Sequence, residues 1–113
     1  MENTPCGKAF MAMYELLDKI YWQKPDNNLS VVLSDICPFT FKGSMSADPA
    51  AWEDFCEYYK EAEAVCDSEF KTGYDTAIRF LRVYEEEWGY PIPYAMEEFT
   101  TEKYREYYFN HNL

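Results

Sequence analysis

Hydrophobic side chains recur at helical spacing along most of the chain. From Phe10 onward, apolar residues fall three and four positions apart, which is the period of one face of an α-helix. Thr4 and Pro5 stand before this stripe and are typical of a helix start, because a side-chain oxygen caps the helix and proline has no N–H to leave unpaired. The pattern predicts a helix from Pro5 to about Trp22, ended by Pro25.

The segment that follows the turn at residues 25–28 fits two structures. Its apolar residues have the spacing of a helix over 29–36, but alternate positions also fit a strand. We predict a short helix capped by Asn28. The next residues, including Phe39 and Phe41, predict a loop held against the core by two aromatic side chains.

Asp48 and Pro49 mark a second strong helix start, and this helix is expected to run to about Cys66. A helical projection at 100° per residue separates it into two faces. The apolar face, expected to lie in the core, holds Trp52, Phe55, Cys56, Tyr59, Ala62 and Cys66.

A third long helix is expected from about Thr72 to Trp88. Thr72 with Asp75 approximates a capping box at its start, and Gly89 suits a C-cap position at its end. Its apolar stripe comprises Tyr74, Ala77, Ile78, Leu81, Tyr84 and Trp88.

The tail carries tyrosines at helical spacing, Tyr104, Tyr107 and Tyr108, which predict a last short helix from Thr100 or Thr101. A chain of 113 residues is long enough for one hydrophobic core. The sequence therefore predicts one all-α domain over residues 1–113, a compact bundle of four to five helices.

The polar face of the helix from Asp48 is acidic. It holds Glu53, Asp54, Glu57 and Glu61. Like charges four residues apart cost a few tenths of a kcal/mol per pair, so local helix stability does not explain them. Glu63 is projected inside the apolar arc, where a carboxylate is unexpected.

Charge is distributed unevenly along the sequence. Residues 48–98 hold fourteen of the 21 acids and four of the 10 basic residues. In the helix from Thr72 the spacing predicts ion pairs of Asp75 with Arg79 and of Arg82 with Glu86, and three acids follow at 85–87. The tyrosines found among these acids are Tyr58, Tyr90 and Tyr94.

The net charge of −11 disfavours direct binding to nucleic acid or to anionic membranes and favours a basic protein partner. No apolar run approaches the roughly 20 residues of a membrane span. The first residues lack the basic and apolar runs of a secretory signal, which predicts a cytoplasmic protein.

The residues that carry most enzyme chemistry are scarce. His111 is the single histidine, and no phosphate-binding or nucleophile-elbow motif is present. The cysteines, Cys6, Cys37, Cys56 and Cys66, lack zinc spacing and are expected to be thiols acting as small core hydrophobes. We predict no catalytic residue, metal or cofactor. The alternative is a small enzyme that uses Cys37 or a carboxylate cluster.

The stretches ADPAAWEDFCEYYKEA (47–62) and YDTAIRFLRVYEEEWGY (74–90) resemble short acidic helical proteins encoded beside bacterial toxins, whose role is immunity. The resemblance implies a non-enzymatic inhibitor that covers a basic nuclease-type toxin. An acidic nucleic-acid mimic is a related alternative.

Three hypotheses about the surface follow. In the first, a basic partner meets the four acids at 53, 54, 57 and 61, with Tyr58, Tyr90 and Tyr94 as apolar anchors. In the second, the acids are only a solvated face. In the third, the chain is a structural homo-oligomer joined through its aromatic tail.

Overall fold

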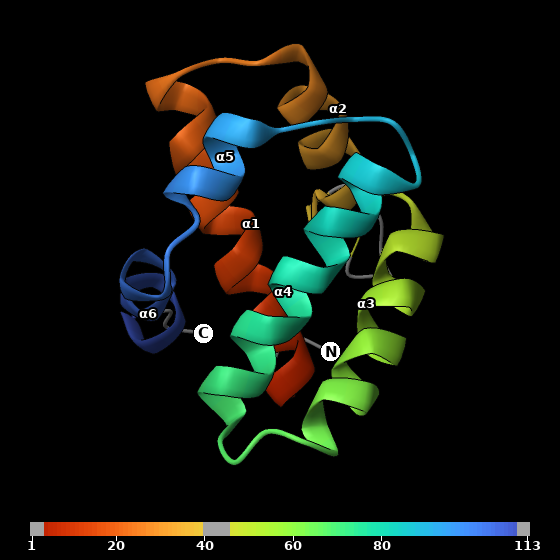
Figure 1. Ribbon diagram of the computed structural model, residues 1–113, viewed down its shortest axis with the longest axis vertical. Coiled ribbons are helices and arrows are strands. Elements are labelled where there is room, and N and C mark those ends of the chain that lie inside the picture. The colour runs from red at the N-terminus through yellow and green to blue at the C-terminus, as the bar shows by residue number, and fades with distance from the viewer. Residues whose placement is uncertain (1–3, 40–45, 111–113) are drawn as a thin grey trace.

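Helices make up most of the described chain. The computed structural model describes residues 4–39 and 46–110, and within them it has six α-helices and no strand (Figure 1). The helices are α1 (Pro5–Gln23), α2 (Asn27–Ile36), α3 (Pro49–Glu63), α4 (Glu69–Glu86), α5 (Pro93–Glu98) and α6 (Thr101–Asn110). The all-α prediction is confirmed. The predicted number of helices, four to five, is too low by at least one. The helix that was missed is α5, whose six residues are too few to show a helical period.

Both Pro-marked helix starts form as predicted. Thr4 Oγ1 accepts a hydrogen bond from Gly7 N at 3.0 Å, and Asp48 accepts one from Ala50 N at 3.0 Å. Each bond satisfies an N–H that the first helical turn leaves without a partner. A side-chain hydroxyl or carboxylate directly before proline was therefore sufficient to predict where each of these two helices begins.

Residues 29–36 are helical, which resolves the ambiguity between helix and strand. The cap was wrong: Asp26, two residues before the expected Asn28, accepts from the N–H groups of Asn28 and Leu29 at 3.4 Å each. The amide of Asn28 instead donates to Pro91 O at 2.9 Å. This bond ties the start of α2 to the segment between α4 and α5.

The loop after α2 is not held as expected. Phe39 is 71% exposed and meets the Tyr14 ring edge-on, with 5.9 Å between ring centroids. Phe39 therefore contacts Tyr14 at the margin of the core but stays mostly exposed, so it does not hold the loop as firmly as expected. Phe41, like His111, lies outside the described residues.

The bounds of α3 and α4 differ from the predicted ones. α3 ends at Glu63, before Cys66, and α4 begins at Glu69 because Ser68 Oγ caps Lys71 N at 3.1 Å. The expected capping box at Thr72 is wrong, since Thr72 is buried within α4 and donates to Ser68 O.

The end of α4 follows from Gly89. This glycine has a φ of 77°, a left-handed conformation that ends helices and that side chains disfavour. α4 stops at Glu86, so Trp88 lies beyond the helix and is 54% exposed. Its assignment to the apolar stripe of α4 was wrong.

The core forms where α1 meets the other helices. Figure 1 shows α4 crossing in front of α1, with α3 on one side and α5 and α6 on the other. Phe55 of α3 packs edge-on against Phe10 of α1 and Phe80 of α4, at 5.0 and 5.6 Å between ring centroids. Such perpendicular contacts suit the charge distribution of aromatic rings. The buried face of α3 is therefore fixed in place, and its opposite face is turned outward.

The tail belongs to the same core. Tyr104 is fully buried and Tyr108 is 2% exposed, and both pack with Phe70 of α4. Lys8 of α1 lies 4.4 Å from the centre of the Tyr108 ring. Tyr104 and Tyr108 are thus covered within the chain, whereas Tyr107 is half-buried. No helix in the described part of the chain has the length and apolar character needed to cross a membrane.

Candidate partner-binding surface

The predicted acidic face is present on α3. Phe55 and Tyr59 are buried on one side of this helix. Glu53 and Glu57 are exposed on the other, and neither forms an ion pair with a described residue. Their position follows directly from the helical period of the apolar residues.

Glu61 differs from its neighbours because it is paired across helices. Arg79 of α4 approaches Glu61 Oε1 at 2.9 Å, with both side chains about half exposed. The same guanidinium lies 4.3 Å from the centre of the Tyr58 ring. The predicted Asp75–Arg79 pair is therefore wrong: Asp75 accepts from the Cys66 thiol at 3.3 Å. An exposed ion pair contributes at most about 1 kcal/mol, but here it neutralises one end of the acidic face.

The other end of the face gathers more acids and an aromatic ring. Tyr58 is half-buried, and its pKa is raised first by burial and then by the negative charge of Asp54, with Glu87 acting in the same direction. Trp88 stacks on Tyr84 at 5.8 Å between ring centroids and lines a small depression that Asp54 and Tyr58 also line. The end of α4 therefore lies against the first half of α3.

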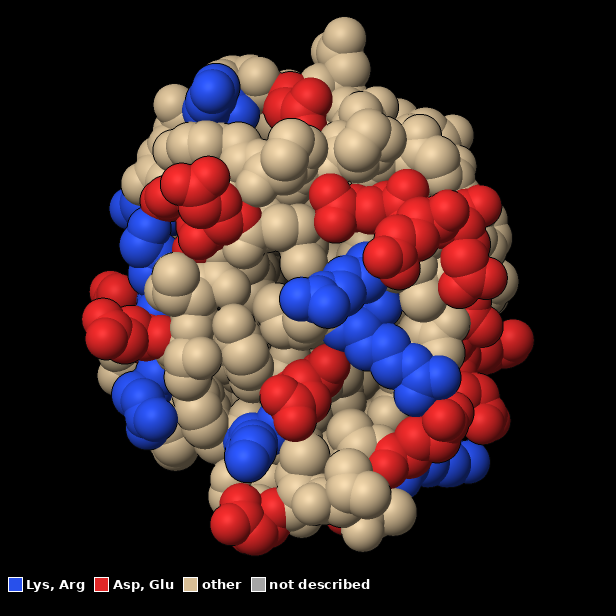
Figure 2. All heavy atoms as spheres, in the orientation of Figure 1, with Lys and Arg blue, Asp and Glu red and all other residues tan. Residues whose placement is uncertain are grey.

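We call this surface the acidic edge and define it by Glu53, Asp54, Glu57, Tyr58, Glu87 and Trp88. Figure 2 shows acidic side chains along the right-hand margin of the molecule, over α3 and the end of α4, with a basic patch towards the middle of the face. Sequence reasoning missed Glu87 and Trp88 as partners of α3. Gly89 is the feature of the sequence that could have indicated this position for Trp88, because its role as a C-cap ends the helix before Trp88.

Glu85 does not belong to the acidic edge. Its Oε2 accepts a hydrogen bond from Ile92 N at 2.8 Å. This bond holds the segment that leads from α4 to α5. Of the three consecutive acids at 85–87, one therefore has a structural role.

Tyr90 and Tyr94, the other predicted anchors, lie on other elements. Tyr90 is half-buried in the segment after α4, where its N–H donates to Tyr84 O at 3.0 Å. Tyr94 is on α5, where Lys24 approaches the centre of its ring at 4.8 Å. Figure 1 places α5 and α3 on opposite sides of α4, so Tyr94 is not next to the α3 acids.

Glu63 does not enter the core, although the helical projection placed it on the apolar face. It is exposed in the last turn of α3. The helical projection placed it inside the apolar arc, but α3 ends there and the core no longer covers that side. Its negative charge acts on Tyr59 and Cys6, where it is one of the smaller causes that raise their pKa.

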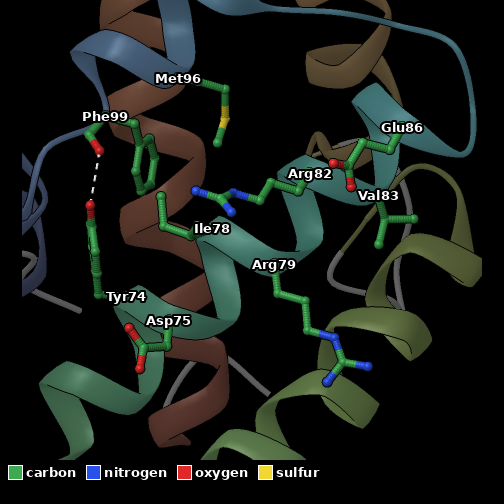
Figure 3. Close-up of a pocket in the computed structure, with 9 residues that line it drawn as sticks. All are labelled: Tyr74, Asp75, Ile78, Arg79, Arg82, Val83, Glu86, Met96 and Phe99. Atoms are coloured by element: carbon green, nitrogen blue, oxygen red, sulfur yellow. Dashed lines mark hydrogen bonds between the residues drawn. The ribbon is translucent and has the colours of Figure 1, made fainter.

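A groove of about 670 Å³ runs between α4 and α5. Its lining combines an apolar floor with charged side chains of α4: Tyr74, Asp75, Ile78, Arg79, Arg82, Val83, Glu86, Met96 and Phe99. Figure 3 shows Arg82 extended across the groove towards Met96 and Phe99, whereas Arg79 points towards α3. The predicted Arg82–Glu86 pair is wrong, because within the described residues Arg82 forms no ion pair.

The side chains that could carry chemistry are the cysteines and the clustered acids. Among residues 4–39 and 46–110, no group of three or more His, Cys, Asp or Glu side chains could hold a metal ion. All four cysteines are half-buried thiols. At Cys37, the residue of the enzyme alternative, the neighbour is the Tyr14 hydroxyl at 4.0 Å. Burial, and then Cys37, raise the pKa of Tyr14 to about 12, so this hydroxyl stays protonated at neutral pH and donates to the Cys37 sulfur.

Comparisons with models of protein families, with curated proteins and with solved structures find no match to this chain.

Proposed function

We propose that this protein is a binding protein whose acidic edge docks on a basic surface of another protein. The observation that carries this proposal is the combination at one place of exposed acids and a half-exposed tryptophan. Trp88 lines a depression with Asp54 and Tyr58 of α3. On the same helix, Glu53 and Glu57 are exposed and form no ion pair with a described residue. Carboxylates would steer a basic partner into place, and tryptophan is among the residues that contribute most to interfaces.

A merely solvated acidic face is the main competing explanation. It accounts for Glu53 and Glu57, but assigns no role to Trp88, which is 54% exposed next to Asp54 and Tyr58 of the same helix. The partner side that fits carries Lys or Arg around an apolar patch. In the immunity-type hypothesis, that partner is a basic nuclease toxin and the bound protein blocks its active site.

Site-specific photo-crosslinking in the cells that naturally contain this protein tests the proposal. A photoreactive amino acid replaces Glu57 on the acidic edge, and in a matched control it replaces Glu102, an exposed acid on α6. We expect position 57 to give a discrete adduct with a basic protein and position 102 to give none. Equal labelling from the two positions, or adducts with acidic proteins, would overturn the proposal.

A further inference from the structure

Two cysteines from distant parts of the sequence meet at the contact between α1 and α3. Cys6 lies in the first turn of α1 and Cys56 in the middle of α3, fifty residues apart, with 3.8 Å between their sulfur atoms. Both side chains are half-buried. The Cys6 S–H points to the Cys56 sulfur as a weak donor.

We propose that Cys6 and Cys56 are a reversible oxidation site that forms a disulfide between α1 and α3. A disulfide has a sulfur–sulfur distance of about 2.05 Å, so the atoms must approach by roughly 1.8 Å from the observed 3.8 Å. Rotation of the cysteine side chains moves their sulfur atoms by this much. The helices that carry them are held by the Phe10–Phe55 contact, in which Phe10 lies one turn from Cys6 and Phe55 directly precedes Cys56.

The oxidant that we name is a low-molecular-weight disulfide such as glutathione disulfide. One cysteine, as thiolate, attacks a sulfur of the oxidant, forms a mixed disulfide and releases one glutathione thiolate. The second cysteine, after losing its proton, attacks the protein sulfur of that mixed disulfide and releases the other glutathione thiolate. Two electrons and two protons pass from the cysteine pair to the oxidant, which becomes two thiols.

The surroundings of the pair predict a slow reaction at neutral pH. Burial raises the pKa of the Cys6 thiol, and the adjacent Cys56 raises it further. Burial also raises the pKa of the Cys56 thiol. The thiolate is the attacking species, so disulfide formation should accelerate as pH rises and should continue to accelerate above the ordinary thiol range.

The other two cysteines have different neighbours. Cys37 contacts the Tyr14 hydroxyl, and Cys66 donates to Asp75. The proposal therefore predicts one specific pairing. The disulfide would close a loop of about fifty residues between the start of α1 and the helix that carries the acidic edge, but it does not depend on the proposed function.

The test uses the full chain with Cys37→Ser and Cys66→Ser, so that only the proposed pair remains. The folded protein is incubated with mixtures of reduced glutathione and glutathione disulfide, and its thiols and mass are measured. We expect an intramolecular disulfide, without retained glutathione, and a higher melting temperature than that of the reduced form. The glutathione equilibrium gives the effective concentration of the Cys6 thiol relative to the Cys56 thiol. We expect this value to be at least about tenfold higher in the folded protein than in guanidinium chloride, where the chain is flexible.

The matched control is Cys6→Ser with Cys56→Ser, which should give glutathione adducts instead of an internal disulfide. If the substitutions disturb folding, peptide mapping of the oxidised chain with all four cysteines shows which cysteines are joined. We expect a disulfide-linked pair of peptides that contain Cys6 and Cys56. Stable glutathione adducts on the proposed pair, another pairing in the folded chain, or equal effective concentrations in folded and unfolded states would each overturn the proposal.

Discussion

At the scale of single residues, Gly73 shows how closely α4 approaches its neighbours. A Cβ atom at this position would lie 2.7 Å from Tyr104 Oη and 2.9 Å from Ala9 Cβ. Alanine is a better helix former than glycine by about 1 kcal/mol, but neither neighbour has room to move, since both are fully buried. We expect Gly73→Ala to lower the free energy of unfolding by about 1–3 kcal/mol in urea denaturation.

A second substitution tests the cause of that loss. Tyr104→Phe removes the hydroxyl that the new Cβ would meet and a long hydrogen bond to Ala9 O at 3.4 Å. In a double-mutant cycle, this change should cost less in the Gly73→Ala background than in the unmodified protein. Independent, additive effects would show that the hydroxyl is not the obstacle.

At the scale of helices, side-chain caps determine where α4 begins. Ser68→Ala removes the cap on Lys71 N and should lower the free energy of unfolding by about 1 kcal/mol. Ser34→Ala is a matched control on the exposed side of α2, where the hydroxyl donates to the carbonyl of Ser30 within the same helix. Thermal and urea denaturation should show a clear loss for the first and almost none for the second. A larger effect at Ser34 would contradict this assignment of the cap.

The sequence predicted helices best where two local signals agree. Thr4-Pro5 and Asp48-Pro49 combine a cap with a proline, and both starts are correct. Ser68 and Asp26 are caps without proline, and both were missed because Thr72 and Asn28, further along, looked equally suitable. α5 was missed since its burial depends on contact with α1 more than on its own six residues.

Cross-helix contacts set the limit on predicting the surface. The helical period correctly predicted that Glu53 and Glu57 are exposed, because the opposite face of the helix must cover the core. The same local reasoning paired Arg79 with Asp75, whereas Arg79 reaches Glu61 on the neighbouring helix. A pair of this kind depends on how two helices are placed side by side, which neither segment specifies alone.

At the scale of the whole molecule, buried tyrosines predict how stability depends on pH. Burial raises the pKa of Tyr104 well above the ordinary value near 10, and burial likewise raises the pKa values of Tyr59 and Tyr84. Above about pH 10 the unfolded chain releases phenolic protons that the folded chain retains. The free energy of unfolding should therefore be unaffected by these groups below about pH 10 and fall as pH rises further.

Tyrosinate absorbance and circular dichroism, recorded together against pH, check this expectation. Exposed tyrosines should ionise first with the helices intact, and the buried ones should ionise together with loss of helix. Tyr104→Phe should make the alkaline loss of stability less steep. Ionisation of every tyrosine near pH 10 in a fully helical protein would contradict the assignment.

The acidic edge is a property of the whole molecule, because α3 and the end of α4 create it together. The most direct test measures affinity for the partner captured by crosslinking, using Glu53→Lys with Glu57→Lys and, as control, Glu102→Lys with Glu106→Lys on α6. Both pairs replace exposed acids and change the net charge equally. We predict that the acidic-edge pair weakens binding at least about tenfold, mainly through local charge complementarity, while the control pair changes it little. Equal weakening by the two pairs would show that net charge, and not this surface, governs binding.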